Sequence, residues 1–201
     1  MSWKIAKLTP TFKKDDAEEI GNYRPISLLS KILEPEVNNT LVHHVFKKHR
    51  LASDRQWAYR QGYSTELLLV HLTETWRKAV DSGLIVAVAF VDFCKAFDSV
   101  LHQVLLEKLC MNFGFCDKAL GWIASYLNGR KQYTVVIGYN SDTIPVSVGI
   151  PQGSVLGPTL FSLFVNDLPS NVKSGSIYLL ADDIMIYCIR RSSRSVGQGF
   201  R

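Results

Sequence analysis

The sequence predicts an α/β (α+β) fold in which an antiparallel sheet is packed against helices. A continuous apolar run, LIVAVAFV, has the β-branched content of a strand and ends at Asp92. Apolar residues recur at helical spacing over residues 28–49 and 65–79. Two pairs of apolar runs later in the chain are each separated by a short polar turn, which is typical of antiparallel hairpins. The 201 residues, 47% hydrophobic, suffice for one substantial core or two small ones.

The first elements are one strand and two helical segments. Residues 3–12 carry β-favouring residues, and a polar turn leads from them into YRPISLL. Pro35 interrupts the helical pattern of residues 28–49. An interior proline removes a backbone hydrogen bond and clashes with the preceding turn, at about 3 kcal/mol or more, so a kink or two helices are expected. Thr65, followed by Glu66, is expected to cap a helix with the apolar face Leu68, Leu72, Trp76 and Ala79.

Strands and helices alternate in the remainder of the chain. Gly83 breaks the chain before LIVAVAFV, whose continuous apolar character predicts a strand covered on both faces. Two helices follow, from about Gln103 to Asn112 and from an Asp117 cap to Gly129. KQYTVVI and TIPVSVGI flank the turn GYNSD and predict a hairpin, and Pro158 is placed to open the helix LFSLFVNDL. A final hairpin is expected to turn at Asp182 and Asp183.

The charge balance suits a partner that carries phosphates. The net charge is +5 and the sequence pI is about 9.0, and neutralised phosphates release condensed counterions, which supplies most sequence-independent affinity. The longest apolar run is too short to span a bilayer, and no N-terminal stretch resembles a signal peptide, so no membrane partner is expected. Residues 191–201 are basic and Ser/Gly-rich, which predicts a disordered tail.

Cysteine and histidine positions do not predict a metal site. The spacing of the four cysteines lacks a C-x-x-C pair, which indicates reduced, buried thiols of an intracellular protein; they are Cys94, Cys110, Cys116 and Cys188. His43, His44 and His49 lie among lysines and an arginine, and a solvated helix face explains them better than metal binding.

Three carboxylates close apolar runs in a way that suits nucleotidyl transfer. Asp92 ends one predicted strand, and Asp182 and Asp183 lie between two others. This chemistry uses two divalent ions about 3.5–4 Å apart, and magnesium takes only one or two carboxylates from the protein. If the strands are neighbours, the carboxylates meet at one edge. Taken singly, an Asp-Asp pair between strands is most often a solvated turn, and an Asp after an apolar run is often a helix cap.

The whole series of motifs resembles the reverse transcriptase of non-LTR (LINE-like, jockey/CR1-type) retrotransposons over nearly the full length. In the family's order the strings are NYRPISLLSKILE, QWAYRQGYSTE, VDFCKAFDSVLH, LLEKL, SYLNGRKQ, VGIPQGSVLGPTLF, NDLP and LLADD. The resemblance implies the fingers and palm of a right-hand polymerase, with residues 1–80 fingers-like and 81–190 palm. It further implies an RNA template, a DNA primer and deoxynucleoside triphosphates, with two Mg²⁺ ions or Mn²⁺ in their place.

Residue by residue, the family pattern makes Asp92 and Asp182 metal ligands and Asp183 the second aspartate of the catalytic pair. Phe97 matches the aromatic under the sugar of the incoming nucleotide, where a rigid ring clashes with a 2′-hydroxyl. Outside this family it would be an ordinary core aromatic. Nuclear action after cytoplasmic assembly is implied by the family's synthesis at a chromosomal nick.

The resemblance also assigns binding roles to loop and fingers residues. Gln152 and Gly153 match the loop that contacts incoming nucleotide and template, stiffened by Pro151 and Pro158, although a plain strand-to-helix connection would look similar. Arg24 and Lys13 are assigned to the triphosphate. Arg60 and the neutral Gln56 are assigned to the template. Taken alone, each of these basic residues reads as a solvated surface charge.

The chain departs from the family pattern at several points. Leu180 replaces the aromatic before Ala-Asp-Asp, Trp57 and Ala58 replace Phe-Gly, and Cys94 replaces a small polar residue. The thumb has no counterpart in the sequence, so a truncated element copy with weak processivity is expected. Two rivals to polymerase activity follow: an inactive remnant that still binds nucleic acid, and a structural α/β domain with unrelated surface aspartates.

Overall fold

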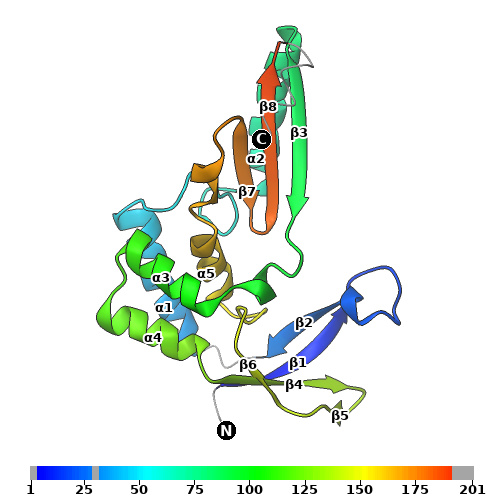
Figure 1. Ribbon diagram of the computed structural model, residues 1–201, viewed down its shortest axis with the longest axis vertical. Helices are drawn as coiled ribbons and strands as arrows, with labels where there is room; N and C mark the ends of the chain where they lie inside the picture. Colours follow the sequence, from blue (N-terminus) through cyan, green and yellow to red (C-terminus); the bar gives the residue numbers. More distant parts are fainter. Residues whose placement is uncertain (1–3, 29–31, 192–201) are drawn as a thin grey trace. The chain divides into compact units, whose positions relative to one another are not determined.

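The computed structural model describes residues 4–28 and 32–191, which form two compact units interleaved along the chain. The first unit comprises Met1–Leu51 and Lys95–Phe164, and the second comprises Ala52–Cys94 and Val165–Arg201. Figure 1 identifies the elements of each. The tail predicted to be disordered begins at the edge of the described residues and otherwise lies outside them. The division into fingers at 1–80 and palm at 81–190 stays a prediction.

The first unit contains a mixed sheet of the order β2-β1-β4, with β5 and β6 both pairing with β4. β1 runs antiparallel to β2 and parallel to β4. Ala6 and Leu8 of β1 are buried while the alternate residues Ile5, Lys7 and Thr9 are exposed, as expected of a sheet with one covered face. The predicted first strand and the hairpin around GYNSD are confirmed. The bounds are β1 Ile5–Phe12, β2 Tyr23–Leu28, β4 Arg130–Val136, β5 Tyr139–Asn140 and β6 Ile144–Val146.

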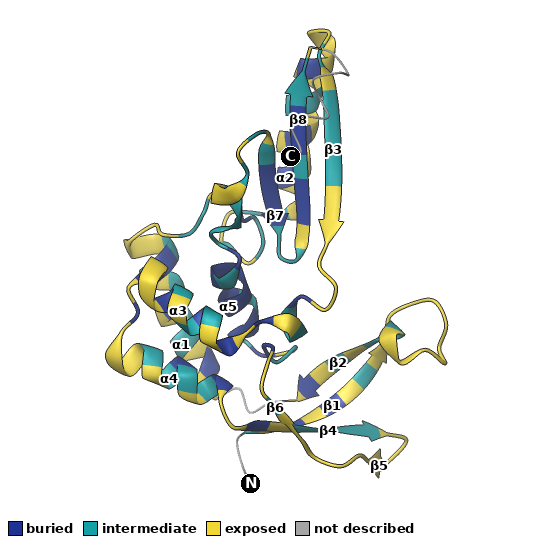
Figure 2. Ribbon diagram, viewed as in Figure 1, coloured by how far each residue is buried: buried dark blue, intermediate teal, exposed yellow. Residues whose placement is uncertain are grey.

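Helices of the first unit bury a separate apolar cluster. α3 packs against both α4 and α5, and α1 packs against α5. Figure 2 shows α5 buried along most of its length, in agreement with its apolar sequence. Gly114, at a φ of 68°, ends α3 in the left-handed conformation that glycine adopts without strain. The bounds are α1 Glu34–Val42, α3 His102–Phe113, α4 Asp117–Leu127 and α5 Gly157–Phe164, with a π-helix at His43–Lys48 and 3-10 turns at Ile20–Asn22 and Phe97–Ser99.

Several predicted boundaries in this unit are wrong. α1 begins at Glu34, so Pro35 lies in its first turn rather than at a kink. Amides in the first turn of a helix have no partner within the helix, so the missing N–H of a proline costs nothing there. The fixed φ of proline also suits the first turn, and Pro35 therefore favours the start of a helix. Asp117 is the first residue of α4, not its cap. α5 ends at Phe164, before the predicted end of its helix.

The second unit is a three-stranded antiparallel sheet of the order β3-β8-β7 with α2 packed against it. The bounds are α2 Thr65–Asp81, β3 Ile85–Asp92, β7 Ser176–Leu180 and β8 Asp183–Arg190, all labelled in Figure 1. A 3-10 turn at Leu168–Asn171 precedes β7. Its core joins α2 to the two C-terminal strands through Leu68, Leu72, Tyr178, Met185 and Tyr187.

Two predictions for the second unit need correction. Ser64, not Thr65, caps α2, because its hydroxyl accepts a hydrogen bond from the Leu67 amide at 3.2 Å. β3 is an edge strand that pairs only with β8 among the described strands. Its apolar run is therefore only partly covered, with Phe90 76% exposed, instead of being buried on both faces.

Cysteine burial also differs from expectation. All four cysteines are free, but three are exposed and Cys188 alone is buried. No helix within residues 4–28 and 32–191 has the length and apolarity needed to cross a membrane.

Candidate active site

Two of the predicted catalytic aspartates face one another across the sheet of the second unit. Asp92 is the last residue of β3 and Asp183 the first of β8, and the two are register partners. Side chains of directly opposed residues project to the same face, with Cβ atoms about 4.5–5.5 Å apart. Asp182 precedes Asp183 in the tight turn between β7 and β8, which Leu180 and Asp183 close as a pair. The structure thus brings the three carboxylates to one end of one sheet.

The turn that carries Asp182 has a constrained backbone. Of its two central residues, Ala181 has a positive φ, 59°, and Asp182 does not, which is the sign pattern of a type II′ hairpin turn. Glycine normally occupies the first central position because a side chain there costs roughly 1–2 kcal/mol. This strain lies beside the proposed catalytic carboxylates, as backbone strain at functional sites often does.

Gln56 supports the same turn from a neighbouring segment. Its Oε1 accepts hydrogen bonds from the amides of Ala58, at 3.0 Å, and Ala181, at 3.3 Å. The main chain on either side of Gln56 pairs with Leu179, whose amide donates to Arg55 and whose carbonyl accepts from Trp57. Gln56 is only 1% exposed, which leaves no surface for a template. The structure shows Gln56 holding the turn, and its predicted template contact stays a prediction.

Arg60 is likewise committed to the protein. Its Nη1 donates to the carbonyls of Ser53, at 2.7 Å, and Gln56, at 3.2 Å, and its guanidinium lies 4.1 Å from the Tyr63 ring centroid. An ion pair of 3.5 Å to Asp54 completes the set, and the Arg60 side chain is 13% exposed. Arg60 therefore closes the loop that contains Gln56, and its predicted template contact stays a prediction.

Tyr59 is a site neighbour that the sequence did not reveal. It lies at a positive φ of 58° and is 51% exposed. Burial of part of the ring and the nearby negative charge of Asp182 raise the pKa of its hydroxyl above the usual value of 10.0. Tyr59, rather than the substituted Ala58, takes the strained conformation in this turn. An aromatic in a turn gives no sequence signal of proximity to a carboxylate.

A second cluster lies within the first unit, where two loops are joined by main-chain contacts. The amide of Ile150 donates to the carbonyl of Phe97, and that of Gly149 donates to Val100, both at 2.8 Å. Gly149 has a φ of 90°, and a Cβ there would lie 2.8 Å from the Asp98 carbonyl oxygen, so only glycine fits. Phe97 stacks on Phe161 of α5 with ring centroids 4.5 Å apart.

Gln152 and Gly153 lie in the same cluster as Phe97. The Nε2 of Gln152 donates to the Asp98 carboxylate at 2.9 Å, and its carbonyl accepts from the Ser27 amide of β2 at 2.8 Å. Gly153 lies against β2 as well, since a Cβ there would be 3.0 Å from the Ser27 carbonyl oxygen. Phe97, Gln152 and Gly153 are therefore held together, and half-buried Pro151 comes immediately before Gln152.

Arg24 and Lys13 lie at the far part of the hairpin formed by β1 and β2. Arg24 is exposed and faces Thr11 across the hairpin, and the amide of exposed Lys13 donates to the carbonyl of Asn22 at 2.9 Å. Both cations project from the hairpin whose other end contacts Gly153. Their grip on a triphosphate stays a prediction.

Three further residues support this cluster and were not predicted. Asp98 orients Gln152, as above. His102, 8% exposed, forms a 2.7 Å hydrogen bond through Nε2 with the carbonyl of Gly149. Glu34, 4% exposed, accepts from the amides of Val155 and Leu156, at 2.6 and 3.2 Å, just before α5. All three residues lie inside the motif strings, and this position was the only sign in the sequence that they support the site.

The family model for reverse transcriptase (RNA-dependent DNA polymerase) matches residues 12–197. The chain belongs to the reverse transcriptase family. Curated relatives include the probable RNA-directed DNA polymerase from transposon BS of Drosophila melanogaster, 35% identical over 92% of this chain and 21% of that protein. The RNA-directed DNA polymerase from mobile element jockey, also of Drosophila melanogaster, is 33% identical over 85% of this chain and 19% of its own length. This reverse transcriptase chain thus spans about a fifth of these relatives.

Solved structures share the fold. Apo telomerase from Candida tropicalis, truncated from its C-terminal domain, aligns with a TM-score of 0.68 and 12% identity over 98% of this chain and 45% of that one. The same enzyme in complex with a fragment of telomeric RNA aligns at a TM-score of 0.69 and 10% identity, covering 98% of this reverse transcriptase chain and 37% of that one. The predicted α/β class is confirmed, and the fold is that of a telomerase-like reverse transcriptase.

The donor set at the end of β3 and β8 fits a hard divalent cation. Carboxylates are offered by the opposed strands β3 and β8 and by the turn between β7 and β8, and carboxylate oxygen is the ligand type that magnesium selects. In the described part of the chain no three acidic, histidine or cysteine side chains converge closely enough to hold an ion by themselves. Magnesium normally retains waters and uses only one or two protein carboxylates, so the opposed pair Asp92 and Asp183 meets the requirement.

Proposed function

We propose that this chain carries the polymerase centre of a non-LTR retrotransposon reverse transcriptase, which adds deoxynucleotides to a primer 3′-hydroxyl on an RNA template. The observation that carries the proposal is the direct opposition of Asp92 and Asp183, with Asp182 in the adjoining turn. Surface aspartates of a structural domain have no reason to be collected at one strand end from segments so distant in sequence.

In this proposal Asp92, Asp182 and Asp183 hold Mg²⁺, or Mn²⁺ in its place. Bound there, the ions would lower the pKa of the primer hydroxyl and neutralise charge on the triphosphate. The protein contributes position: the β3/β8 register fixes two carboxylates, and Gln56 and Arg60 fix the turn that bears the third. Positioning supplies much of the rate of phosphoryl transfer.

The cluster of the first unit would receive the nucleotide. Phe97 is held by Phe161 and by the loop at Ile150, so its ring has little freedom to yield to a 2′-hydroxyl. Gln152 is oriented by Asp98, while Arg24 and Lys13 offer fixed positive charge for a triphosphate. The names of the relatives support an RNA template for this chain.

Primer extension on an RNA template with Mg²⁺ tests the proposal. Incorporation of deoxynucleotides is expected to fall at least a thousandfold in Asp92→Asn and Asp183→Asn, because the charge that binds the ions is lost. Asp142→Asn, an exposed acidic site in the first unit, is the control and should match the unaltered chain. Substituting Phe97→Val should permit ribonucleotide incorporation.

A chain that binds an RNA–DNA hybrid but extends no primer would overturn the catalytic proposal and favour the inactive remnant. Equal incorporation by the unaltered chain and Asp183→Asn would do the same, because the signal would then come from elsewhere.

A further inference from the structure

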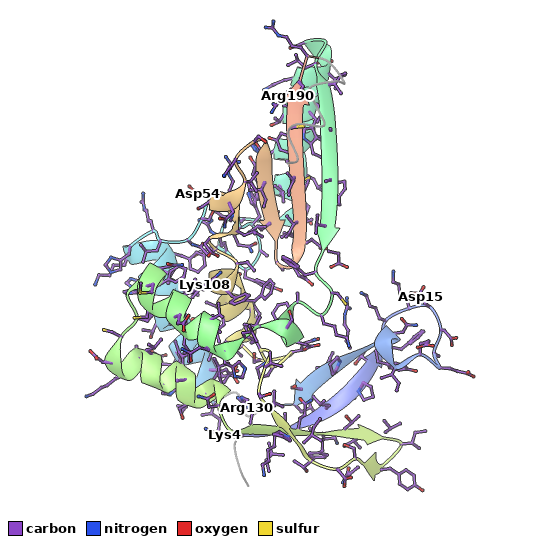
Figure 3. All side chains as sticks on the ribbon, viewed as in Figure 1. Lys4, Asp15, Asp54, Lys108, Arg130 and Arg190 are labelled. Carbon is purple, nitrogen blue, oxygen red and sulfur yellow. The ribbon has the colours of Figure 1, made fainter. Side chains whose placement is uncertain are left out.

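A cavity of about 160 Å³ lies within the first unit, lined by none of the residues assigned above to metal, nucleotide or template. The residues that matter for its chemistry are Lys4, Glu34, Trp122, Tyr126 and Arg130. Figure 3 shows the labelled Lys4 and Arg130 close together where β4 begins. This cavity combines positive charge with aromatic surface.

Arg130 is the least ordinary residue of the cavity. It is only 7% exposed, its Nε donates to the carbonyl of Tyr126 at 2.9 Å, and its Nη1 has no hydrogen-bond partner in the described structure. A buried guanidinium donor without a partner is costly, because water that solvated it has been removed. Arg130 lines the cavity, and a guanidinium in such a place is matched best by an anionic acceptor such as phosphate.

Aromatic rings extend from this cation in a stack. The Trp122 and Tyr126 rings are nearly parallel, at 8°, with centroids 5.6 Å apart. The guanidinium of Arg130 lies 4.5 Å from the Tyr126 centroid. Burial raises the pKa of the Tyr126 hydroxyl, although nearby Ser154 and Arg130 act in the opposite direction. Flat rings of this kind accept unpaired bases regardless of sequence.

The local charge favours an anion. Lys4 donates through Nζ to the carbonyl of Asn128 at 2.9 Å, and a Cβ at Gly129 would be 3.9 Å from that Nζ. The one carboxylate of the lining, Glu34, already accepts from two backbone amides. Arg130 could instead have a purely structural role, which is to neutralise the charge of Glu34. Within the described residues, however, no ion pair of 4.0 Å or less joins the two side chains. Two cations against one carboxylate leave one net positive charge.

We propose that this pocket binds a phosphate of a single-stranded nucleic acid, with Arg130 and Lys4 on the phosphate and Trp122 under the neighbouring base. The pocket is a second contact for a strand, separate from the carboxylates proposed for catalysis. An acidic peptide would satisfy the cations but would leave the stacked rings unused.

Binding of a fluorescein-labelled ten-nucleotide RNA, followed by anisotropy in EDTA over a series of salt concentrations, tests the pocket without catalysis. Lys4→Gln and Arg130→Gln should each weaken binding and reduce the slope of log K against log salt by about 0.7, the loss of one single-strand phosphate. Trp122→Ala should weaken binding about fivefold or more with an unchanged slope. Lys131→Gln, the exposed cation next to Arg130, is the matched control and should change the slope less than either pocket variant.

Tryptophan fluorescence provides a second readout on the chain with its buried arginine intact, and Trp122→Phe identifies which part of the signal comes from Trp122 among the four tryptophans. We expect a 5′-phosphorylated dinucleotide to quench this fluorescence. Inorganic phosphate and a glutamate-rich peptide at equal concentration should not quench it. Equal response to inorganic phosphate would overturn the assignment to a strand, and response to the peptide alone would overturn the nucleic-acid class. Equal slopes for Lys4→Gln and Lys131→Gln would overturn the site.

The Asp183→Asn variant, measured in parallel, separates failure of the pocket proposal from failure of the polymerase proposal. This variant should bind the RNA normally in EDTA.

Discussion

Ala181 occupies a backbone conformation that alanine seldom adopts. The strain in its φ of 59° arises from its Cβ. Replacement by glycine removes that contact, although glycine also adds freedom to the unfolded chain.

We expect Ala181→Gly to raise the free energy of unfolding by about 0.5–1 kcal/mol, the difference between these two effects. Urea denaturation measures it. The matched change Ala119→Gly, in the interior of α4, should lower the same quantity by about 0.5–1 kcal/mol. A loss of stability in both variants would show that Ala181 is not strained.

The ionisation of Tyr59 reports the charge at Asp182. Burial and that carboxylate both raise the pKa of the tyrosine, so the hydroxyl stays protonated at pH values where a free tyrosine ionises. A raised pKa contributes stability that is complete below pH 10 and is lost as pH rises through the folded-state value.

Asp182→Asn should therefore lower the pKa of Tyr59 without returning it to the ordinary value, because burial is the larger cause and persists. Titration of the Tyr59 ring carbon by NMR measures the change. Asp54→Asn, whose carboxylate pairs with Arg60, serves as the control. A pKa that does not move would mean that Asp182 does not lie beside the ring.

At the scale of elements, the hairpin of β7 and β8 depends on a segment far away in sequence. Gln56 reaches its turn, and the chain on either side of Gln56 pairs with Leu179 of β7. The hairpin itself was predictable from two apolar runs around a polar pair. The brace was not, because a glutamine in a loop has no pattern that distinguishes a buried acceptor from a surface contact.

Gln56→Met keeps the length of the side chain but removes the acceptor for the amides of Ala58 and Ala181. We expect a loss of about 1–2 kcal/mol in the free energy of unfolding, because two amides lose their partner while the unpartnered Nε2 is also removed. Thermal or urea unfolding measures it. Gln103→Met, at an exposed position of α3, should change stability by less than about 0.5 kcal/mol, and an equal effect at both positions would contradict the brace.

Boundary errors in the elements have a common physical cause. Pro35 favours both a kink within a helix and a helix start, and the choice depends on the chain before it, which is strand as far as Leu28. The apolar run of β3 indicated burial on two faces, yet the sheet places it at an edge. Local pattern specifies the type of element, whereas coverage depends on neighbours that are distant in sequence.

At the scale of the whole molecule, the interleaving of two units was not predictable from composition, because no linker separates them. Each unit has its own buried cluster, which includes Leu105 in the first and Leu72 in the second. The predicted site residues divide between them: the aspartates belong to the second unit, and Phe97, Gln152 and Gly153 belong to the first. The motif strings contain the members of both sets, but the sequence has no signal for the internal hydrogen bonds of buried Gln56 and half-buried Arg60.

Separate cores should respond separately to cavities. Leu105→Ala and Leu72→Ala are each expected to cost about 2–5 kcal/mol, because both side chains are almost fully buried. Amide hydrogen exchange should show the loss of protection mainly in the unit that carries the substitution. Uniform loss across both units in either variant would mean that the chain unfolds as one cooperative body.

The β3/β8 pairing has a consequence for the nascent chain. Residues 85–92 leave the ribosome long before their partner strand, which begins at Asp183. At about 5–20 residues per second, the delay is on the order of 5–20 seconds, during which an apolar segment has an unpaired edge. The strand that supplies Asp92 is therefore a segment that chaperones have reason to shield, and the opposition of Asp92 and Asp183 forms only after β8 has left the ribosome.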